Sequence, residues 1–247
     1  MANTDYGLLT ERFCVSIQGK ELPALVKNNR VDGIFLVGGL FTPELIERLK
    51  EKKIPIIAIG RYYDQIDSVS TDVTQGVYLG VRYLLDQGYR KICYINCPQI
   101  YRSNAERVAG VQKAMREFHL EMKPDWLVYC KHNTGEGGYE AIKRLWQSGA
   151  RPQAIAAANE PIALGIMRFL YEQDIRIPED IAIVSYEDSV LGGYAVPALT
   201  SVNIQKEYMG ELAARIMLKR IRKGQEGELE HIIVEPNLVV RSSVGKC

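Results

Sequence analysis

The stretch that decides the fold lies at residues 154–188 and reads AIAAANEPIALGIMRFLYEQDIRIPEDIAIVSYED. An apolar run ends at Asn159, a segment with helical periodicity follows, and a second apolar run ends at Tyr186, just before two acidic residues. This pattern predicts a strand, a helix and a second strand, with polar residues at the carboxyl end of each strand. Ligands of open α/β sheets bind at those ends. The stretch therefore predicts both the class of fold and the place of a binding site.

The composition is that of an ordinary globular protein, with 247 residues of which 47% are hydrophobic and 25% charged. The formal net charge of +1 gives no basic excess of the kind that nucleic-acid binders carry. No run approaches the ~18 consecutive apolar residues of a membrane span. Residues 1–6 lack the basic and apolar regions of a signal peptide. These features predict a cytoplasmic protein that does not enter a membrane.

Residues that carry chemistry are few and scattered. The five cysteines are an odd set without a Cys-x-x-Cys pair, which predicts reduced thiols: Cys14, Cys93, Cys97, Cys130 and Cys247. His119, His132 and His231 lack the spacing of metal ligands, and no nucleophile elbow, P-loop or dinucleotide fingerprint occurs. We therefore expect no metal, no cofactor and no catalysis. Glu160 and Glu187 could form a carboxylate pair for glycoside hydrolysis, but sugar binding uses the same residue types.

Strands and helices are predicted to alternate along the chain, which indicates βαβ units and a mostly parallel sheet. The apolar runs that predict strands are 31–37, 54–59, 92–95, 126–129, 154–158 and 181–185, with a last strand at 232–240. The segments with helical periodicity begin at Thr42 and Asp72 and continue with 106–118, 135–146, 161–171 and 207–221. The basic run at 219–223 is interpreted as a helix C-terminus, where it complements the helix dipole, rather than as a DNA contact.

Nine motifs in order connect the chain with a known family: RVDGI at 30–34, DVTQG at 72–76, LLDQGYRKI at 84–92, ERVAG at 106–110, NE followed by ALG at 159–165, IPEDI at 177–181, YED at 186–188, PALTSV at 197–202 and LVVRSS at 238–243. Together they resemble the effector-binding region of the LacI/GalR family of transcriptional regulators. The resemblance implies a periplasmic-binding-protein-like type I fold, with two doubly wound parallel-sheet lobes. The expected lobes are 1–89 with 203–228, and 90–202 with 229–247.

The same resemblance implies a small-molecule effector, expected to be a sugar, bound in the cleft between the lobes. It also implies a homodimer that contacts DNA only through a helix-turn-helix segment, which these residues do not contain. Met1 aligns near the family's second strand, expected here at Tyr6–Thr10, so the first lobe is predicted to lack its first βα unit. That loss would leave an unpaired edge near residues 31–36 and favour self-association. The alternatives are a solute-binding subunit of a transporter and, less expected, a sugar-processing enzyme.

Three candidate ligand contacts lie within or at the start of predicted helices. Arg107 could place its forked guanidinium on ligand hydroxyls or a carboxylate, although a surface arginine or a structural ion pair is the competing interpretation. Ser103 precedes Arg107 by one helical turn and faces the same side, but it could be a plain helix cap. Asp72 matches a family cleft acid and could equally be a cap.

The remaining candidates follow predicted strands. Asn159 can donate and accept hydrogen bonds, and it could also cap the helix that follows. Glu187 should lie near it, and its carboxylate suits paired sugar hydroxyls, although the family often has the shorter aspartate there. Asn133 aligns with a family pocket position, and Tyr101 could stack on a ring. Asp188 is interpreted as a structural residue.

Overall fold

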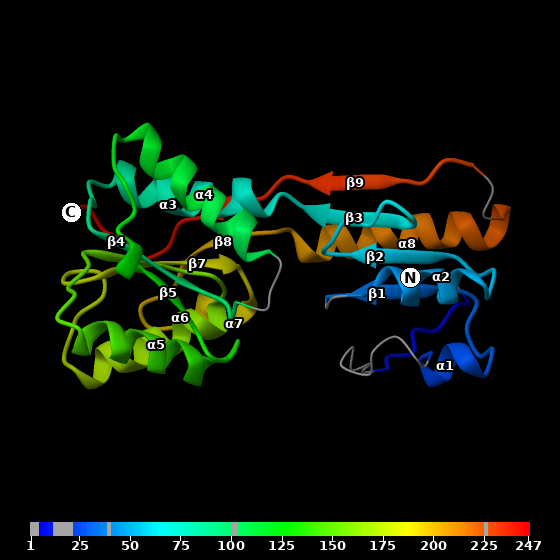
Figure 1. Cartoon of the computed structure of the whole chain (residues 1–247), viewed down its shortest axis with the longest axis horizontal. Coiled ribbons are helices and arrows are strands. Elements are labelled where there is room, and N and C mark those ends of the chain that lie inside the picture. The colour runs from blue at the N-terminus through cyan, green and yellow to red at the C-terminus, as the bar shows by residue number, and fades with distance from the viewer. Residues whose placement is uncertain (1–4, 12–21, 39–40, 100–102, 225–226) are drawn as a thin grey trace. The chain divides into compact units, whose positions relative to one another are not determined.

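The computed structural model describes residues 5–11, 22–38, 41–99, 103–224 and 227–247. The chain divides into two compact units, 1–71 with 206–234 and 72–205 with 235–247 (Figure 1). The predicted lobes broke instead after residues 89, 202 and 228. The difference arises because the helix after Asp72 packs on strands and a helix of the second unit, so it belongs with that unit.

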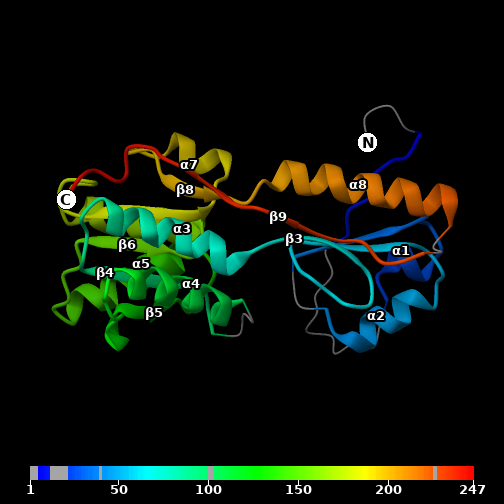
Figure 2. The ribbon, with the colours of Figure 1, turned by 90° about the horizontal axis from the view of Figure 1, so that it is seen from above.

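Unit 1 is built on a four-stranded sheet in the order β1-β2-β3-β9, all parallel. The strands are β1 (Ile34–Val37), β2 (Ile56–Ile59), β3 (Asp67–Thr71) and β9 (His231–Val234). Helix α8 (Lys206–Lys223) packs on one face against β2 and β3, while α1 (Ala24–Lys27) and α2 (Pro43–Lys50) lie on the other (Figure 2). Helix α2 starts as predicted, with the Thr42 hydroxyl accepting a hydrogen bond from the Leu45 amide at 3.3 Å.

The edge of the unit 1 sheet corrects one expectation. Residues 6–10 form no strand, and Leu8 and Leu9 are 70% and 60% exposed. A strand needs a hydrogen-bonded neighbour, and none of the described residues supplies one to this segment. Within the described residues, β1 therefore pairs only with β2, and Val37 is 68% exposed at this edge.

Unit 2 is a three-layer α/β structure around a six-stranded sheet in the order β10-β8-β7-β6-β4-β5. The strands are β4 (Ile92–Asn96), β5 (Leu127–Tyr129), β6 (Ala154–Ala157), β7 (Ala182–Glu187), β8 (Thr200–Asn203) and β10 (Asn237–Val239). Only β10 is antiparallel to its neighbour. Each apolar run predicted from the sequence overlaps a strand, and the parallel α/β class is confirmed.

Helices cover both faces of this sheet. The pair α3 (Val73–Asp86) and α4 (Asn104–Glu117) packs on one face, and α5 (Gly135–Gln147) and α6 (Glu160–Glu172) pack on the other (Figure 1). The short helix α7 (Val190–Tyr194) and the 3₁₀ turn η1 (Pro124–Trp126) were not predicted. The core between these layers includes the fully buried side chains of Tyr94, Ile95, Ile142, Ile155 and Ile162.

Three strand assignments depart from the sequence analysis. Strands β3 and β8 were missed because their residues are mostly polar by type yet buried. The segment predicted as one strand at 232–240 forms two strands, β9 and β10, which lie on either side of Glu235-Pro236 and join different sheets.

The basic run at 219–223 ends α8, as predicted. Arg220 within this run is buried, however, and its guanidinium donates hydrogen bonds to the Asp67 carboxylate at 2.8 and 2.9 Å.

Candidate functional site

The carboxyl edge of the unit 2 sheet contains a topological switch point. Strands β4 and β6 are neighbours, but the chain leaves β4 into α4 on one face of the sheet and leaves β6 into α6 on the other. Such a divergence opens a crevice beyond the strand ends, which is where ligands of open α/β sheets bind. Most of the residues singled out from the sequence lie around this point.

Asn159, Asn133 and Cys97 form one hydrogen-bonded group near this switch point. Asn159 follows β6, is 3% exposed, and uses its side-chain oxygen to accept from the Ile162 amide at 3.0 Å, so it caps α6. Its Nδ2 donates to Oδ1 of Asn133 and contacts the Cys97 Sγ at 3.7 Å. The Cys97 thiol donates to Asn133 Oδ1 at 3.5 Å. Asn159 therefore caps α6 through its oxygen and is bound to Asn133 and Cys97 through its nitrogen, and its contact with a ligand stays a prediction.

Arg107 lies on the first turns of α4 and is 8% exposed. Its Nη1 donates to the Ser103 hydroxyl, and its Nε has no hydrogen-bond partner among the described residues. Ser103 stands at the N-cap position but makes no side-chain cap bond, so its hydroxyl serves Arg107 instead. A solvated arginine and a plain cap therefore do not describe this pair, and Arg107 forms no ion pair with the described residues.

The charge of Arg107 acts on two buried tyrosine hydroxyls, those of Tyr94 and Tyr186. Burial strongly raises the pKa of Tyr94 and of Tyr186, while the positive charge of Arg107 lowers both pKa values in part. Neither hydroxyl has a hydrogen-bond partner among the described residues, and the same holds for Nδ2 of Asn96 and Oδ1 of Asn104. We refer to Tyr94, Asn96, Asn104, Arg107 and Tyr186 as the Arg107 cluster.

Glu187 ends β7 in a left-handed backbone conformation, with φ of 99°, and Asp188 follows with φ of 50°. Two consecutive non-glycine residues in this region need local support, since each is disfavoured by contacts of its Cβ. Glu187 is half-buried, and its carboxylate raises the pKa of both Cys97 and Tyr186. Glu187 thus lies beside the Arg107 cluster, on the side of β7.

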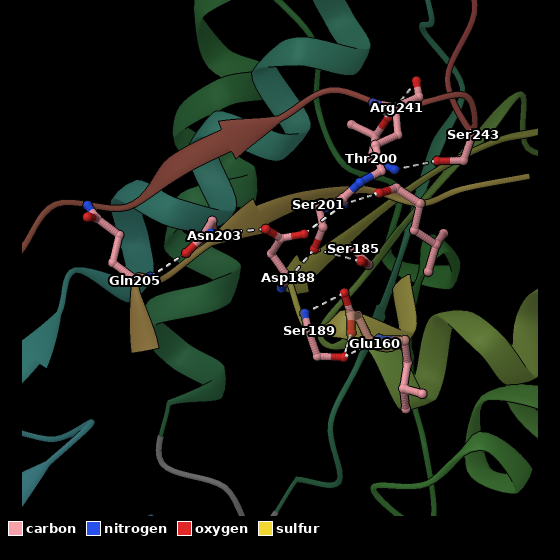
Figure 3. Close-up of polar contacts among 12 residues, drawn as sticks. Glu160, Ser185, Asp188, Ser189, Thr200, Ser201, Asn203, Gln205, Arg241 and Ser243 are labelled. Atoms are coloured by element: carbon pink, nitrogen blue, oxygen red, sulfur yellow. Dashed lines mark hydrogen bonds and ion pairs between the residues drawn. The ribbon is translucent and has the colours of Figure 1, made fainter. Parts of the chain in front are cut away.

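Asp188 supplies that support through a second polar group (Figure 3). Its carboxylate accepts from Arg241 Nη1 at 2.7 Å and from Asn203 Nδ2 at 2.9 Å, and its amide donates to the Ser201 hydroxyl at 3.1 Å. We refer to Asp188, Ser201, Asn203 and Arg241 as the Asp188 cluster. None of its buried side-chain atoms lacks a partner, which agrees with the structural role predicted for Asp188.

Three other candidates are placed differently. Asp72 is exposed and caps α3, accepting from the Gln75 amide at 2.8 Å, although its charge still raises the pKa of Tyr186. Glu160 is 1% exposed and directs both carboxylate oxygens at Ser189, one to the amide at 2.8 Å and one to the hydroxyl. The carboxylate of Glu160 therefore holds Ser189, the residue that precedes α7. Tyr101 lies outside the described residues.

The sequence analysis missed five residues of this site, namely Tyr94, Asn96, Cys97, Asn104 and Tyr186. Asn96 and Cys97 end β4 as Asn159 ends β6, so the same reasoning from polar strand ends could have found them. Tyr94 and Tyr186 fall in or at the end of predicted strands, and their residue type alone does not show that their hydroxyls lack partners. Burial raises the pKa of the Cys97 thiol, and the charge of Arg107 only partly offsets this, so the thiol is a polar contact rather than a nucleophile.

Metal ligands and membrane spans were sought over the described ranges. In those ranges no three His, Cys, Asp or Glu side chains gather in a way that could hold a metal ion. No helix there combines the length and the apolar character that crossing a bilayer requires.

Comparison with known proteins finds a matching family model and similar transcriptional repressors. A family model described as a periplasmic binding protein-like domain matches residues 81–244. The HTH-type transcriptional repressor PurR of Klebsiella pneumoniae is 31% identical over 225 residues, which is 90% of this chain and 65% of the repressor. The chain thus spans just under two thirds of the length of that curated relative.

Solved structures show the same architecture. The complex of the transcriptional regulator CelR with cellobiose superposes with a TM-score of 0.78 at 30% identity, covering 86% of this chain and 66% of CelR. A LacI family transcriptional regulator from Enterococcus faecium with bound ribose gives a TM-score of 0.79 at 26% identity, covering 90% and 84%.

Proposed function

Because the chain belongs to the family of periplasmic binding protein-like domains, we propose that it is the effector-binding region of a LacI-type transcriptional regulator. The proposed effector is a small polar molecule, with a sugar as first candidate, bound at the carboxyl edge of the unit 2 sheet. Relatives named as repressors and regulators support this, and two neighbours were solved with cellobiose and ribose.

The observation that carries the proposal is the Arg107 cluster. Native proteins hydrogen-bond nearly all their buried polar atoms, yet this cluster leaves several without a partner beside a buried guanidinium. It lies at the switch point of an open α/β sheet, which is the expected ligand position. A bound molecule with several hydroxyls would satisfy these atoms, whereas an apolar molecule would not.

Signalling in this proposal rests on differential affinity. An effector shifts a regulator between two conformations only by as much as it binds one better than the other. We propose that the full-length regulator acts as a homodimer and binds DNA through a helix-turn-helix segment outside these 247 residues. The chain by itself should then bind a small molecule without binding an operator.

A thermal-shift screen tests effector binding. The library contains monosaccharides, disaccharides, sugar phosphates and nucleobases, with ribose and cellobiose included. A compound present at 100 times its Kd should stabilise the chain by about 2.7 kcal/mol. The parent chain should respond to at least one compound, and the response should be lost in Arg107→Ala and retained in Arg168→Ala, whose side chain is 75% exposed. An Arg107 variant that responds like the parent would refute the site.

Gel retardation tests the separation of DNA binding from effector binding. The net charge is +1, and we assign no helix among the described residues to the role of a recognition helix in the major groove. We expect no sequence-specific retardation of operator fragments at physiological salt. Tight and specific retardation by this chain alone would contradict the proposal.

A further inference from the structure

Buried polar atoms without partners are concentrated at one place in the described part of the chain. Such atoms occur there on six residues, and five of these make up the Arg107 cluster. Its members are at most 8% exposed, so bulk water does not solvate them. The sixth is Thr71, in unit 1. A concentration of this kind indicates a recess with a specific purpose rather than scattered local defects.

We propose that the hydroxyls of Tyr94 and Tyr186 are ligand-binding groups, which together with Arg107 form a hydrogen-bonding recess for one hydroxyl of the effector. This inference rests on the proposed function and extends it, because it adds two specificity-determining residues and the chemical group that they recognise.

The ring of Tyr186 packs closely against the backbone of α3 at Gly76. A Cβ added to Gly76 in the first turns of α3 would lie 2.6 Å from Cε2 of Tyr186 and 3.2 Å from its hydroxyl. The ring of Tyr186 therefore packs against the backbone at the start of α3, where only glycine leaves room for it. Tyr94 pairs in register with Ala156 of β6. The charge of Arg107 acts on both hydroxyls and lowers the pKa of each in part.

The donors and acceptors of the cluster define the recognised group. Arg107 Nε and Asn96 Nδ2 can only donate, each tyrosine hydroxyl can donate or accept, and Asn104 Oδ1 can only accept. A carboxylate would satisfy the donors but leave the Asn104 oxygen unpaired. A sugar hydroxyl both accepts and donates, so it can satisfy both kinds of atom. Sites built to hydrogen-bond a substrate hydroxyl strongly reject analogues that lack it.

Replacing each tyrosine by phenylalanine tests the inference without any ligand. Tyr89 is the matched control, since it is equally buried but donates to the Gly245 carbonyl at 3.2 Å. Tyr89→Phe should lower the denaturant midpoint, because it removes a satisfied hydrogen bond. Tyr94→Phe and Tyr186→Phe should leave the midpoint unchanged or raise it, because each removes an unpaired buried hydroxyl. A loss in both variants equal to that of Tyr89→Phe would overturn the inference, since their hydroxyls would then be bonded within the folded protein.

A binding measurement separates this inference from the proposed function. The probe is the library compound that stabilises the parent chain most in the thermal-shift screen. Calorimetry should show its Kd rising at least tenfold in Tyr186→Phe and in Tyr94→Phe, while Tyr89→Phe stays within twofold of the parent. An unchanged Kd in both variants would overturn the inference and leave the proposed function standing. A screen without any responding compound would count against the proposed function, and the unfolding measurements would still decide whether the hydroxyls are unpaired.

Discussion

Two polar clusters at the same edge of the unit 2 sheet differ in one respect. The Asp188 cluster joins β7, β8 and the segment after β10, and every buried side-chain atom in it has a partner (Figure 3). The Arg107 cluster joins β4, β7 and α4, and each of its five residues has a buried side-chain atom without one. Both clusters contain an arginine and an asparagine, so the presence of these residue types does not separate them.

The difference indicates a division of roles. A satisfied buried network contributes stability and holds one backbone conformation, here the left-handed turn at Glu187 and Asp188. An unsatisfied one costs stability in the free protein, and it is retained where a ligand will complete it. Substitutions in the Asp188 cluster should therefore act mainly on unfolding, and substitutions in the Arg107 cluster mainly on binding.

The largest effect is expected from Arg107→Ala. Removing a buried charged partner of a ligand should cost about 2–4 kcal/mol of binding free energy, and the fold should survive. Isothermal titration with the compound identified by screening measures the loss, and circular dichroism checks the fold. An affinity equal to that of the parent would show that the guanidinium does not contact the ligand, and the comparison between clusters would fail.

Asp188→Asn should give the next largest effect, on stability rather than binding. Asparagine tolerates the left-handed backbone, so the change isolates the lost charge opposite Arg241. Breaking a largely buried ion pair from one side should cost about 1–3 kcal/mol here, since Arg241 keeps some exposure. The double variant Asp188→Asn, Arg241→Met should lose less than the sum of the single variants, because no unpaired charge remains. Additive losses would show that the pair is not coupled.

The approach of Tyr186 to α3 gives a smaller, local effect. In Gly76→Ala the new Cβ must displace the Tyr186 ring, which lies 2.6 Å from its position. Overpacking of this kind should cost about 1–2 kcal/mol of stability and should also weaken ligand binding. Gly80→Ala is the control one turn later, where the nearest atom, Cγ2 of Val202, is 3.3 Å away. The two substitutions gain the same helix propensity, so equal midpoints would show that Tyr186 is free to move.

The sequence predicted most of the fold, for identifiable reasons. The strands with uniformly apolar residues, such as 154–157, were found because a buried parallel strand needs such residues on both faces. Strand β3 was missed because Asp67 marks it as polar, and only its tertiary partner Arg220 makes burial of that carboxylate acceptable. Residues 6–10 were wrongly predicted as a strand because pairing depends on a neighbour, which local sequence does not contain.

The candidate site was predicted in part for the same reasons. Arg107 and Asn159 were found because they occupy recognisable motifs at a helix start and a strand end. The hydroxyl of Tyr94 was not, because its lack of a partner depends on β4, β7 and α4 coming together. The unsatisfied state of a side chain is a property of the tertiary structure, so residue type and spacing do not reveal it.

The smallest effect is expected at an exposed ion pair, Arg176 with Asp180. It shows whether hydrogen bonds stabilise a polar pair that is not buried. Asp180 accepts two hydrogen bonds from the Arg176 guanidinium and one from the Arg176 amide, yet both side chains are exposed. These bonds lower the pKa of Asp180 from 3.8 to about 2. A carboxyl group whose pKa is lowered on folding stabilises the protein above its unfolded pKa, and this stabilisation is lost as the pH falls through the folded value. The unfolding midpoints of the parent and of Asp180→Asn should therefore differ slightly at pH 5 and converge as the pH falls through 2.

Because solvent screens exposed pairs, the difference in midpoint between the parent and Asp180→Asn at pH 5 should be smaller than the difference between the parent and Asp188→Asn. If Asp180→Asn lowered the midpoint as much as Asp188→Asn, the partners of a polar group would matter more than its burial, and the contrast between the two clusters would have to rest on hydrogen bonding alone.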